Sequence, residues 1–309
     1  MRALLVVNPK ATTTSERSRD VLVRALRSEV RLEVAYTRRR GHAAELARTA
    51  GAREFDLVVT LGGDGTVNEV VNGLMTAGAA TAAERPALAV VPGGSTNVFA
   101  RALGLPRDWV EGTADILAAL RDGRSRTIGL GRADDRYFTF CAGMGLDAAV
   151  IRQVERARLR GRVSTPALYL RSAMTRYLLD TERRHAQILL ERPDEPAETE
   201  LATVIIQNTA PWTYLGDRPV NPNPLASFDT GLDLMALRGL HPASTARAVA
   251  QMLSRRPGPQ GRRVLRLHDI AEFSLRASGP QPFQLDGDYL GEREKVQFTA
   301  VADAIRVIC

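Results

Sequence analysis

The chain has 309 residues, of which 44% are apolar and 25% are charged, and its formal net charge is +7. This composition is typical of a globular protein, is sufficient for two domains, and excludes disordered and collagen-like chains. Cys141 and Cys309 are too few for a disulfide framework or a zinc site, which favours a reducing compartment. Aromatic residues make up only 5%, so we do not expect a nucleic-acid partner bound by base stacking.

The apolar stretches of the sequence are too short to predict export or membrane insertion. Residues 1–9 contain too few apolar residues for the core of a signal peptide. The longest uncharged stretch, residues 201–216, is interrupted by Gln207, Asn208 and Pro211, so it does not suit a spanning helix. We therefore expect a cytoplasmic protein that contacts the membrane only peripherally.

The first part of the chain alternates between strands and helices. Strands are predicted at Ala3–Asn8, Arg31–Thr37, Leu57–Gly62 and Ala87–Val91, and helices around residues 21–26, begun by Ser15, and at His42–Ala50, closed by Gly51. Such alternation predicts a doubly wound parallel α/β domain, to which we assign residues 1–125.

After residue 125 the pattern changes to short strands separated by turn residues. The predicted strands are Arg126–Leu130, Tyr137–Cys141, Gln187–Leu190, Thr203–Gln207, Leu232–Leu237, Val264–Leu267, Glu272–Leu275, Phe283–Leu285 and Lys295–Thr299. Exposed loops are expected at 191–200 and 254–263. This pattern predicts an antiparallel β-sandwich domain over residues 126–309, with a helical insertion.

The insertion is the basic segment between Arg152 and Arg184, where nine arginines stand against three acidic residues. Apolar residues are interleaved with the arginines, a pattern typical of an amphipathic helix lying on an anionic membrane. A solvated basic helix face explains the same pattern equally well, and the sequence leaves both interpretations open.

A glycine-rich turn, Gly62-Gly63-Asp64-Gly65-Thr66, stands where a buried strand ends and a helix begins. Consecutive glycines and a helix amino terminus present backbone N–H groups to phosphate. The known fingerprints fail, because there is no P-loop lysine and Asn68 stands where a dinucleotide motif needs its third glycine. A carboxylate beside phosphates repels them unless Mg²⁺ lies between, so Asp64 indicates either a bound metal–nucleotide complex or a catalytic base. A plain tight turn is the alternative.

Two further turns are candidates for the same site. Gly93-Gly94-Ser95-Thr96-Asn97 follows the next strand and opens a helix, so it would converge with the first turn on one ligand, unless Ser95 or Thr96 only caps the helix. Asp286-Gly287-Asp288 separates two predicted strands, which is also the pattern of an ordinary hairpin turn.

Together these motifs resemble the diacylglycerol kinase catalytic-domain family of bacterial lipid kinases, which is related to sphingosine kinases and NAD kinases. The resemblance rests on six motifs in the family's order: Val7-Asn8-Pro9-Lys10, Thr37-Arg-Arg-Arg-Gly41-His42-Ala43, the turn at Gly62–Glu69, the turn at Gly93–Arg101, Gly143-Met-Gly145-Leu-Asp147 and Leu285-Asp286-Gly287-Asp288.

The resemblance implies ATP-dependent phosphorylation of the hydroxyl of diacylglycerol or a related long-chain alcohol, with ATP and Mg²⁺ as cofactors. By position it implies a nucleotide site made of Asn8, Pro9, Lys10, Thr37, Gly63, Asp64, Gly65, Thr66, Asn68, Glu69 and Ser95. It further implies two catalytic residues, Asp64 and the general base Asp288. Asn97 and Asp147 would contact the lipid, and Asp64 and Asp286 would be ligands of Mg²⁺.

The chain departs from the family's pattern at four places, one of which is Ala11-Thr12, where Ser-Gly is common after the first turn. Asp288 replaces the usual Glu, and Val98 stands where many members have Asp. Thr230 stands where some members place the Asp of a structural Mg²⁺ site, so a second metal is not expected. An NAD kinase-like enzyme and a non-catalytic lipid- or nucleotide-binding regulator stay open as alternatives.

The resemblance and the charge pattern also predict partners. We expect the lipid substrate at the membrane surface and anionic lipid bound by residues 152–184, on the inner face of the membrane. A homodimer is left open.

Overall fold

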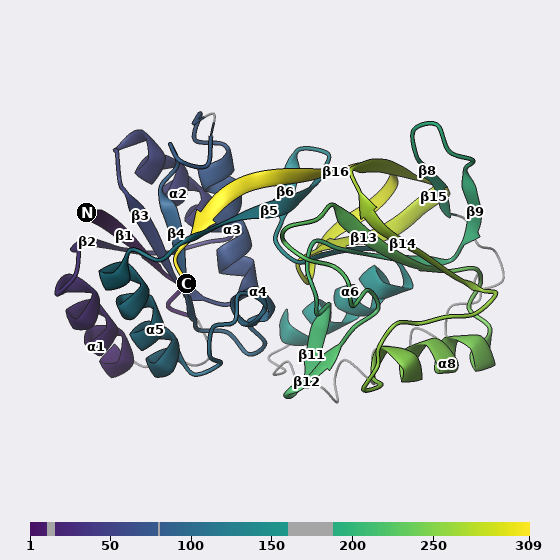
Figure 1. The fold of residues 1–309 in the computed structure, drawn as a ribbon, viewed down its shortest axis with the longest axis horizontal. Helices are drawn as coiled ribbons and strands as arrows, with labels where there is room; N and C mark the ends of the chain where they lie inside the picture. The colour runs from purple at the N-terminus through teal and green to yellow at the C-terminus, as the bar shows by residue number, and fades with distance from the viewer. Residues whose placement is uncertain (11–15, 80, 160–187) are drawn as a thin grey trace. The chain divides into compact units, whose positions relative to one another are not determined.

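The computed structural model describes residues 1–10, 16–79, 81–159 and 188–309, and the chain forms two compact units (Figure 1). The first unit comprises residues 1–130 and 302–309, and the second comprises residues 131–301. The predicted boundary between residues 125 and 126 lies at the start of strand β5, Arg126–Ala133, whereas the two units divide inside this strand.

The carboxyl-terminal residues belong to the first unit, which the predicted domain ranges do not include. The long strand β16, Asp288–Val307, ends beside strand β4, Ala87–Pro92, where Val307 pairs in parallel with Leu88. The backbone N–H of Ile308 then donates to the carbonyl of Leu88 at 2.9 Å.

The first unit is built on a parallel sheet with the strand order β4-β3-β1-β2. Strands β1, β2 and β3 are Arg2–Val7, Arg31–Tyr36 and Leu57–Gly62. Every residue of β3 and β4 is buried, as expected for central parallel strands covered on both faces.

Helices cover both faces of this sheet, which confirms the predicted doubly wound α/β architecture (Figure 1). Helices α1, Glu16–Arg27, and α5, Trp109–Asp122, lie on one face, where Leu22, Leu26 and Ile116 join the core. Helices α2, His42–Ala52, and α3, Asp64–Met75, lie on the other, and the short helix α4, Val98–Ala102, follows β4.

Helix α2 continues through Gly51, where the sequence had suggested its end. A Cβ atom on Gly51 would lie 2.7 Å from Cβ of Ala77. The glycine therefore allows close packing inside the helix, and α2 ends two residues later at its C-cap, Arg53.

The second unit is antiparallel, as predicted, and its described residues also form two helices. Its strands are β5, β6 (Arg136–Phe138), β7 (Cys141–Gly145), β8 (Ile188–Glu191), β9 (Glu198–Leu201), β10 (Thr203–Gln207), β11 (Thr213–Leu215), β12 (Arg218–Val220), β13 (Leu232–Leu237), β14 (Val264–Ile270), β15 (Glu272–Leu285) and β16, and its helices are α6 (Leu146–Leu159) and α8 (Pro242–Met252). The sheet has the order β14-β13-β10-β7-β15-β16, with β8 and β9 joined to β15 and with β11–β12 as a separate hairpin.

Strand β15 unites two segments that the sequence had suggested as separate strands. Its residues 274–277 pair with β8, and its residues 283–285 pair with β7. Because one strand serves two neighbours, it bends around the interior of the unit and keeps pairing with β16 on both sides of a bulge.

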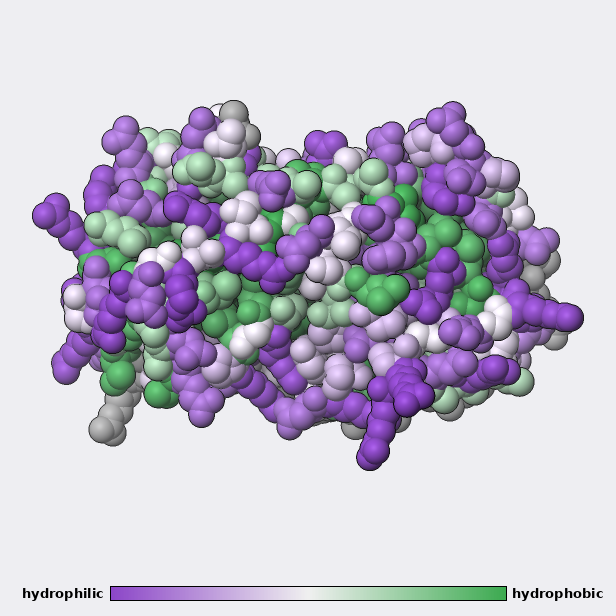
Figure 2. Space-filling view, in the orientation of Figure 1, coloured by the Kyte–Doolittle hydropathy of each residue, from purple (hydrophilic) through white to green (hydrophobic). Residues whose placement is uncertain are grey.

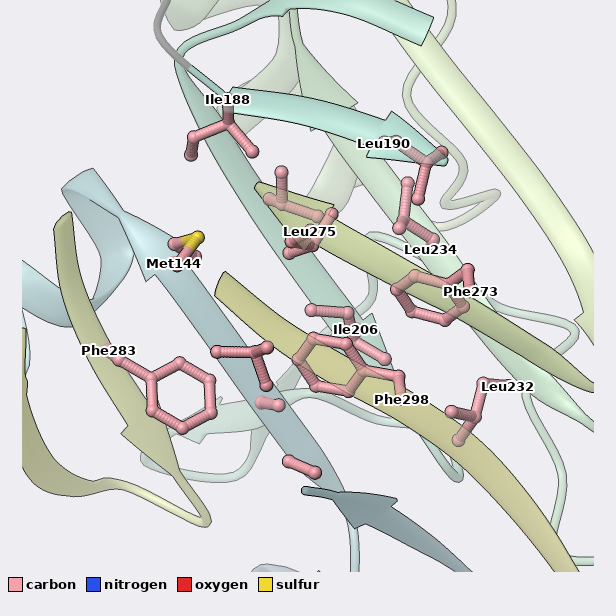
Figure 3. Close-up of a cluster of buried hydrophobic side chains, with 14 of the residues drawn as sticks. Met144, Ile188, Leu190, Ile206, Leu232, Leu234, Phe273, Leu275, Phe283 and Phe298 are labelled. Atoms are coloured by element: carbon pink, nitrogen blue, oxygen red, sulfur yellow. The ribbon is translucent and has the colours of Figure 1, made fainter. Parts of the chain in front are cut away.

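The core of the second unit lies inside this bent sheet (Figure 3). Phe298 stacks on Phe273 with ring centroids 4.9 Å apart, and Phe283 meets it edge-on at 6.3 Å. Aliphatic residues from six other strands, including Ile206 and Leu234, complete the cluster. Such aromatic pairs stabilise a fold beyond the effect of buried area.

Three other sequence predictions can be placed. The loop expected at 191–200 contains strand β9, and α8 had not been expected. The basic segment begins within α6, but its residues 160–184 lie outside the described residues. In the part of the chain that the structure describes, no helix is both long enough and apolar enough to cross a membrane.

Candidate functional site

The two glycine-rich turns at the ends of β3 and β4 lie backbone against backbone. The N–H of Gly93 donates to the carbonyl of Gly62 at 2.9 Å. A Cβ atom on Gly94 would lie 2.6 Å from Cα of Gly63, closer than any side chain permits. Glycine is therefore required here for contact between the strand ends, and the structure joins the two turns into one surface at the carboxyl edge of the sheet.

Asp64 fastens the second turn to the first. It is the first residue of α3, and its carboxylate accepts two backbone hydrogen bonds, from the N–H of Val98 to Oδ2 and from the N–H of Phe99 to Oδ1, both at 3.1 Å. Its negative charge thus lies at the amino termini of α3 and α4, where helix dipoles favour it.

Asn97 shapes the second turn from within. Its backbone is left-handed, with φ of 50°, and its side chain is 4% exposed. Oδ1 accepts the N–H of Gly94 at 2.8 Å, and Nδ2 donates to the carbonyl of the same residue at 2.9 Å. The amide is thus engaged at both ends in its own turn, whereas Ser95 in that turn is exposed.

The end of β1 joins the same edge. Nδ2 of Asn8 donates to Oγ1 of Thr66 at 3.2 Å, and Oδ1 of Asn8 accepts the backbone N–H of Lys10 at 3.0 Å. Pro9 and Lys10 are exposed. A cationic side chain therefore follows β1 at the edge where the glycine turns present their amides.

Glu69 anchors the loop that follows β2. Its Oε1 accepts the N–H of Gly41 at 2.7 Å, and its Oε2 accepts the N–H of Ala43 at 3.1 Å. Gly41 has φ of 82°, which favours glycine, and it forms the N-cap of α2. Both oxygens of Glu69 therefore act in capping α2, and Thr37 lies in the loop so held. His42 is a helix-start residue, and its Nδ1 accepts the backbone N–H of Arg38.

In the second unit, Asp286 and Gly287 form a two-residue hairpin turn between β15 and β16. Their φ values of 48° and 78° are those of a turn matched to the twist of the strands. The Asp286 carboxylate accepts four hydrogen bonds. Oδ2 accepts from the N–H and Oγ1 of Thr139 at 2.7 and 2.8 Å, and Oδ1 accepts from the N–H of Phe140 and Cys141 at 3.0 and 3.1 Å.

These contacts decide which carboxylates fit Mg²⁺. Four hydrogen bonds occupy the acceptor positions of Asp286, so this residue does not fit the metal role that the resemblance implied. Asp64 lies where the two glycine-rich turns meet, at the starts of α3 and α4, and Mg²⁺ commonly takes one carboxylate together with phosphate oxygens and water. Among the described residues, no cluster of three or more His, Cys, Asp or Glu side chains is arranged to hold a metal.

Asp147 is a buried carboxylate in the first turn of α6. Burial raises its pKa from 3.8 to about 7, although a hydrogen bond from Nε2 of Gln284 to its Oδ2, at 2.8 Å, opposes the shift. Gly143 makes room for it, since a Cβ atom there would lie 1.8 Å from Oδ2 of Asp147. Oε1 of Gln284 also accepts the N–H of Gly287 at 3.0 Å, next to the partly exposed Asp288.

With this geometry in place, the chain can be compared with known proteins. Residues 2–133 match the diacylglycerol kinase catalytic domain. This part of the chain is therefore similar to that catalytic domain. The match contains the motifs of the first unit and ends before Gly143–Asp147 and Asp286–Asp288.

Curated relatives are similar over the same part of the chain. The diacylglycerol kinase of Bacillus subtilis (strain 168) is 47% identical over 105 residues, which are 34% of this chain and 32% of the relative. That of Staphylococcus haemolyticus (strain JCSC1435) is 34% identical over 152 residues, which are 49% and 43% of the two chains. The matches thus span a third to two fifths of the relatives' length.

Solved structures extend the likeness to the whole fold. A crystal structure of a diacylglycerol kinase from Bacillus anthracis str. Sterne superposes with a TM-score of 0.73 at 19% identity, covering 99% of this chain and 96% of that one. At this identity the likeness shows the fold of both units.

Sequence reasoning missed the residues that hold Asp147 and Asp286 in place. Gln284 is 1% exposed and lies between Phe283 and Leu285, and a polar side chain in such an apolar strand is the signal that could have marked it. Thr139 and Asn208 carry no comparable signal, although Nδ2 of Asn208 donates to the carbonyl of Thr139 at 3.0 Å.

Proposed function

We propose that this protein is an ATP-dependent lipid kinase that transfers the γ-phosphate to the hydroxyl of diacylglycerol or a related long-chain alcohol. The observation that carries the proposal is the backbone contact between the turns at Gly62–Gly63 and Gly93–Gly94, within the part that matches the diacylglycerol kinase catalytic domain. Ligands of parallel α/β sheets bind at this edge, and free amides at a helix start suit phosphate. The names of the curated relatives support a diacylglycerol acceptor.

The first unit would bind the nucleotide. Lys10 follows β1, Gly63 to Thr66 follow β3 and Ser95 follows β4, so all lie along one edge of the sheet. Lys10 would contribute positive charge to the phosphates. Mg²⁺, when bound, neutralises charge on the transferring phosphoryl group, and Asp64 is the residue that would hold it.

The second unit would supply the acceptor side of the reaction. Asp288, at the end of the hairpin that Asp286 holds, would accept the proton of the lipid hydroxyl as the new O–P bond forms. Burial raises the pKa of Asp147 to about 7, so its protonated form is accessible near neutral pH and could donate a hydrogen bond to an oxygen of the acceptor.

We also propose that the protein works in the cytoplasm, peripherally on the inner face of the membrane, and that the basic segment at 152–184 contacts anionic lipid. Arg152 itself pairs with Glu292 at 3.0 Å, so the later arginines would carry this contact. Replacing Arg156, Arg158, Arg160 and Arg162 with Ala should then weaken salt-sensitive binding to anionic vesicles, and unchanged binding would reject the contact.

Labelled ATP, Mg²⁺ and a lipid extract in mixed micelles test the function directly, with products resolved by head group. We expect label on a lipid alcohol, a loss of about 10²- to 10⁴-fold in turnover for Asp288→Asn, and little change for the exposed control Asp135→Asn. Label on NAD but on no lipid would identify an NAD kinase-like enzyme. Tight calorimetric binding of ATP and Mg²⁺ without any product would identify a regulator.

A further inference from the structure

A second concentration of positive charge lies between Asp233 and Asp269. Residues 234–268 contain seven arginines and no lysine, aspartate or glutamate, whereas the whole chain has a net charge of +7. Unlike the segment at 152–184, this stretch lies entirely within the described residues. Its charge can therefore be placed in the structure.

The arginines gather around helix α8 and the loop that follows it, residues 253–263. The loop folds back on the last turn of the helix, because the N–H of Gln260 donates to Oε1 of Gln251 at 3.1 Å. Arg247 is exposed on the helix, and Arg255, Arg256 and Arg262 are exposed on the loop.

These four arginines are not neutralised within the described part of the chain. None of them forms an ion pair with another described residue, whereas Arg238 in the same stretch pairs with Glu198. Exposed arginines around one short helix create a local positive potential that attracts an anionic partner.

Apolar side chains are exposed in the same region. Ala248 and Met252 on the inner side of α8 are buried, while Val249 on its outer side is 47% exposed. The hairpin β11–β12 lies beside the end of the helix, because Nη2 of Arg218 donates to the carbonyl of Leu253, and Leu215 on this hairpin is 38% exposed.

The pictures agree with this arrangement. Helix α8 and the hairpin both lie along the lower border of the second unit in Figure 1, and the same border is lined with hydrophilic side chains, in purple, in Figure 2.

We propose that α8, the loop 253–263 and the hairpin β11–β12, here called the α8 surface, bind an anionic lipid bilayer. Arginines with shallow apolar side chains between them are the chemistry of an interfacial contact, in which charge meets lipid phosphates and apolar groups enter the acyl boundary. No Phe, Trp or Tyr occurs between 238 and 268, and the hairpin adds only Tyr214, so the α8 surface lacks the set of aromatic side chains on which nucleic-acid bases stack. The inference rests on the proposed function in one respect, which is that the acceptor is a membrane lipid.

Vesicle sedimentation of the full chain tests the charge. With phosphatidylcholine vesicles that contain phosphatidylglycerol, the double variant Arg255→Ala/Arg256→Ala should bind roughly 10- to 30-fold more weakly, since each arginine near the surface contributes about fivefold. The matched control is Arg24→Ala/Arg27→Ala, which removes the same charge from exposed positions on α1 and should change binding by less than about twofold.

A second pair of variants tests the apolar part. Val249→Asp on α8 and Val110→Asp on α5 place the same charge at exposed valines of similar accessibility, 47% and 53%. Only Val249→Asp should weaken binding to the anionic vesicles, and circular dichroism should show both variants folded.

Three results would overturn the proposal. They are unchanged vesicle binding in both α8-surface variants, an equal loss in the α1 control, and a loss confined to binding of a single-stranded oligonucleotide. Phosphorylation of a short-chain, water-soluble diacylglycerol separates a failure of this proposal from a failure of the proposed function. The α8-surface variants should phosphorylate this substrate as wild type does, because it needs no membrane. If the wild-type chain phosphorylates no lipid yet binds vesicles through the α8 surface, only the kinase proposal is contradicted.

Discussion

Gln284 joins Asp147 to the hairpin turn that carries Asp288. Its Nε2 donates to Oδ2 of Asp147 at 2.8 Å, while its Oε1 accepts the N–H of Gly287 at 3.0 Å. One buried amide therefore connects the carboxylate at the start of α6 with the turn between β15 and β16. Asp147, which the resemblance assigned to lipid binding, is thus linked through Gln284 to the turn residue that precedes Asp288.

Replacing Asp147 with Asn should remove part of the pH dependence of stability. The pKa of Asp147 rises from 3.8 to about 7 on folding, so between these pH values the native state holds a proton that the unfolded chain has lost. The free energy of unfolding should therefore fall as pH rises from about 4 to about 7, and the penalty should be complete above the folded pKa. Urea midpoints across this range should show a shallower slope in Asp147→Asn than in wild type.

The exposed variant Asp135→Asn is the control, and its slope should match that of wild type. An identical slope in Asp147→Asn would mean that this carboxyl is not the group that takes up the proton.

Gly94→Ala should destabilise the first unit and weaken nucleotide binding. The new Cβ would lie 2.6 Å from Cα of Gly63, so the two turns must separate. Overpacking of this kind costs about 1–3 kcal/mol. Gly279→Ala is the control, because a Cβ there meets nothing within 4 Å. Denaturant midpoints and ATP titrations should both separate the variants, and equal behaviour would show that the turns need no close contact.

The two turns also show what sequence reasoning can reach. The continuous apolar runs of β3 and β4 are bounded by glycine, and their limits and parallel pairing were predicted to within a residue. The pairing of Val307 with Leu88 was not predictable, because nothing local marks a strand end that returns across the sequence to a distant partner.

Recognising a carboxylate in a motif did not reveal what it binds. Glu69 was assigned to the nucleotide, yet it accepts the N–H of Gly41, 28 positions away. Asp286 was assigned to a metal, yet it accepts from Thr139, 147 positions away. Such partners are set by the packing of whole elements, so residue type and spacing predict a polar site but leave its hydrogen bonds open.

Asp64→Asn should show whether Asp64 only caps helix α4 or also holds Mg²⁺. Asp64 uses one oxygen for the N–H of Val98 and the other for that of Phe99, and an Asn side chain has only one oxygen to offer. We expect a loss of about 1–2 kcal/mol in stability and a loss of Mg²⁺-dependent ATP binding. Thermal unfolding and calorimetry with and without Mg²⁺ measure the two effects.

Asp108→Asn is the matched control, because Oδ1 of Asp108 alone caps α5 by accepting from Val110 and Glu111. Asn can replace this cap at a cost of a few tenths of a kcal/mol. If Asp64→Asn keeps wild-type Mg²⁺ dependence, Asp64 is a capping residue and not a metal ligand.

Asp286→Asn and Asp288→Asn should have opposite effects, although only Gly287 separates them. Asp286 is 4% exposed and accepts four hydrogen bonds, so an amide NH₂ would face N–H donors and leave them unpaired, costing about 2–5 kcal/mol. Asp288 is partly exposed, so its variant should unfold within about 0.5 kcal/mol of wild type while losing turnover. Urea unfolding and phosphorylated-lipid formation should be measured on both variants. A stable Asp286→Asn would show that Asp286 does not hold the turn, and a fully active Asp288→Asn would show that Asp288 does not accept the proton.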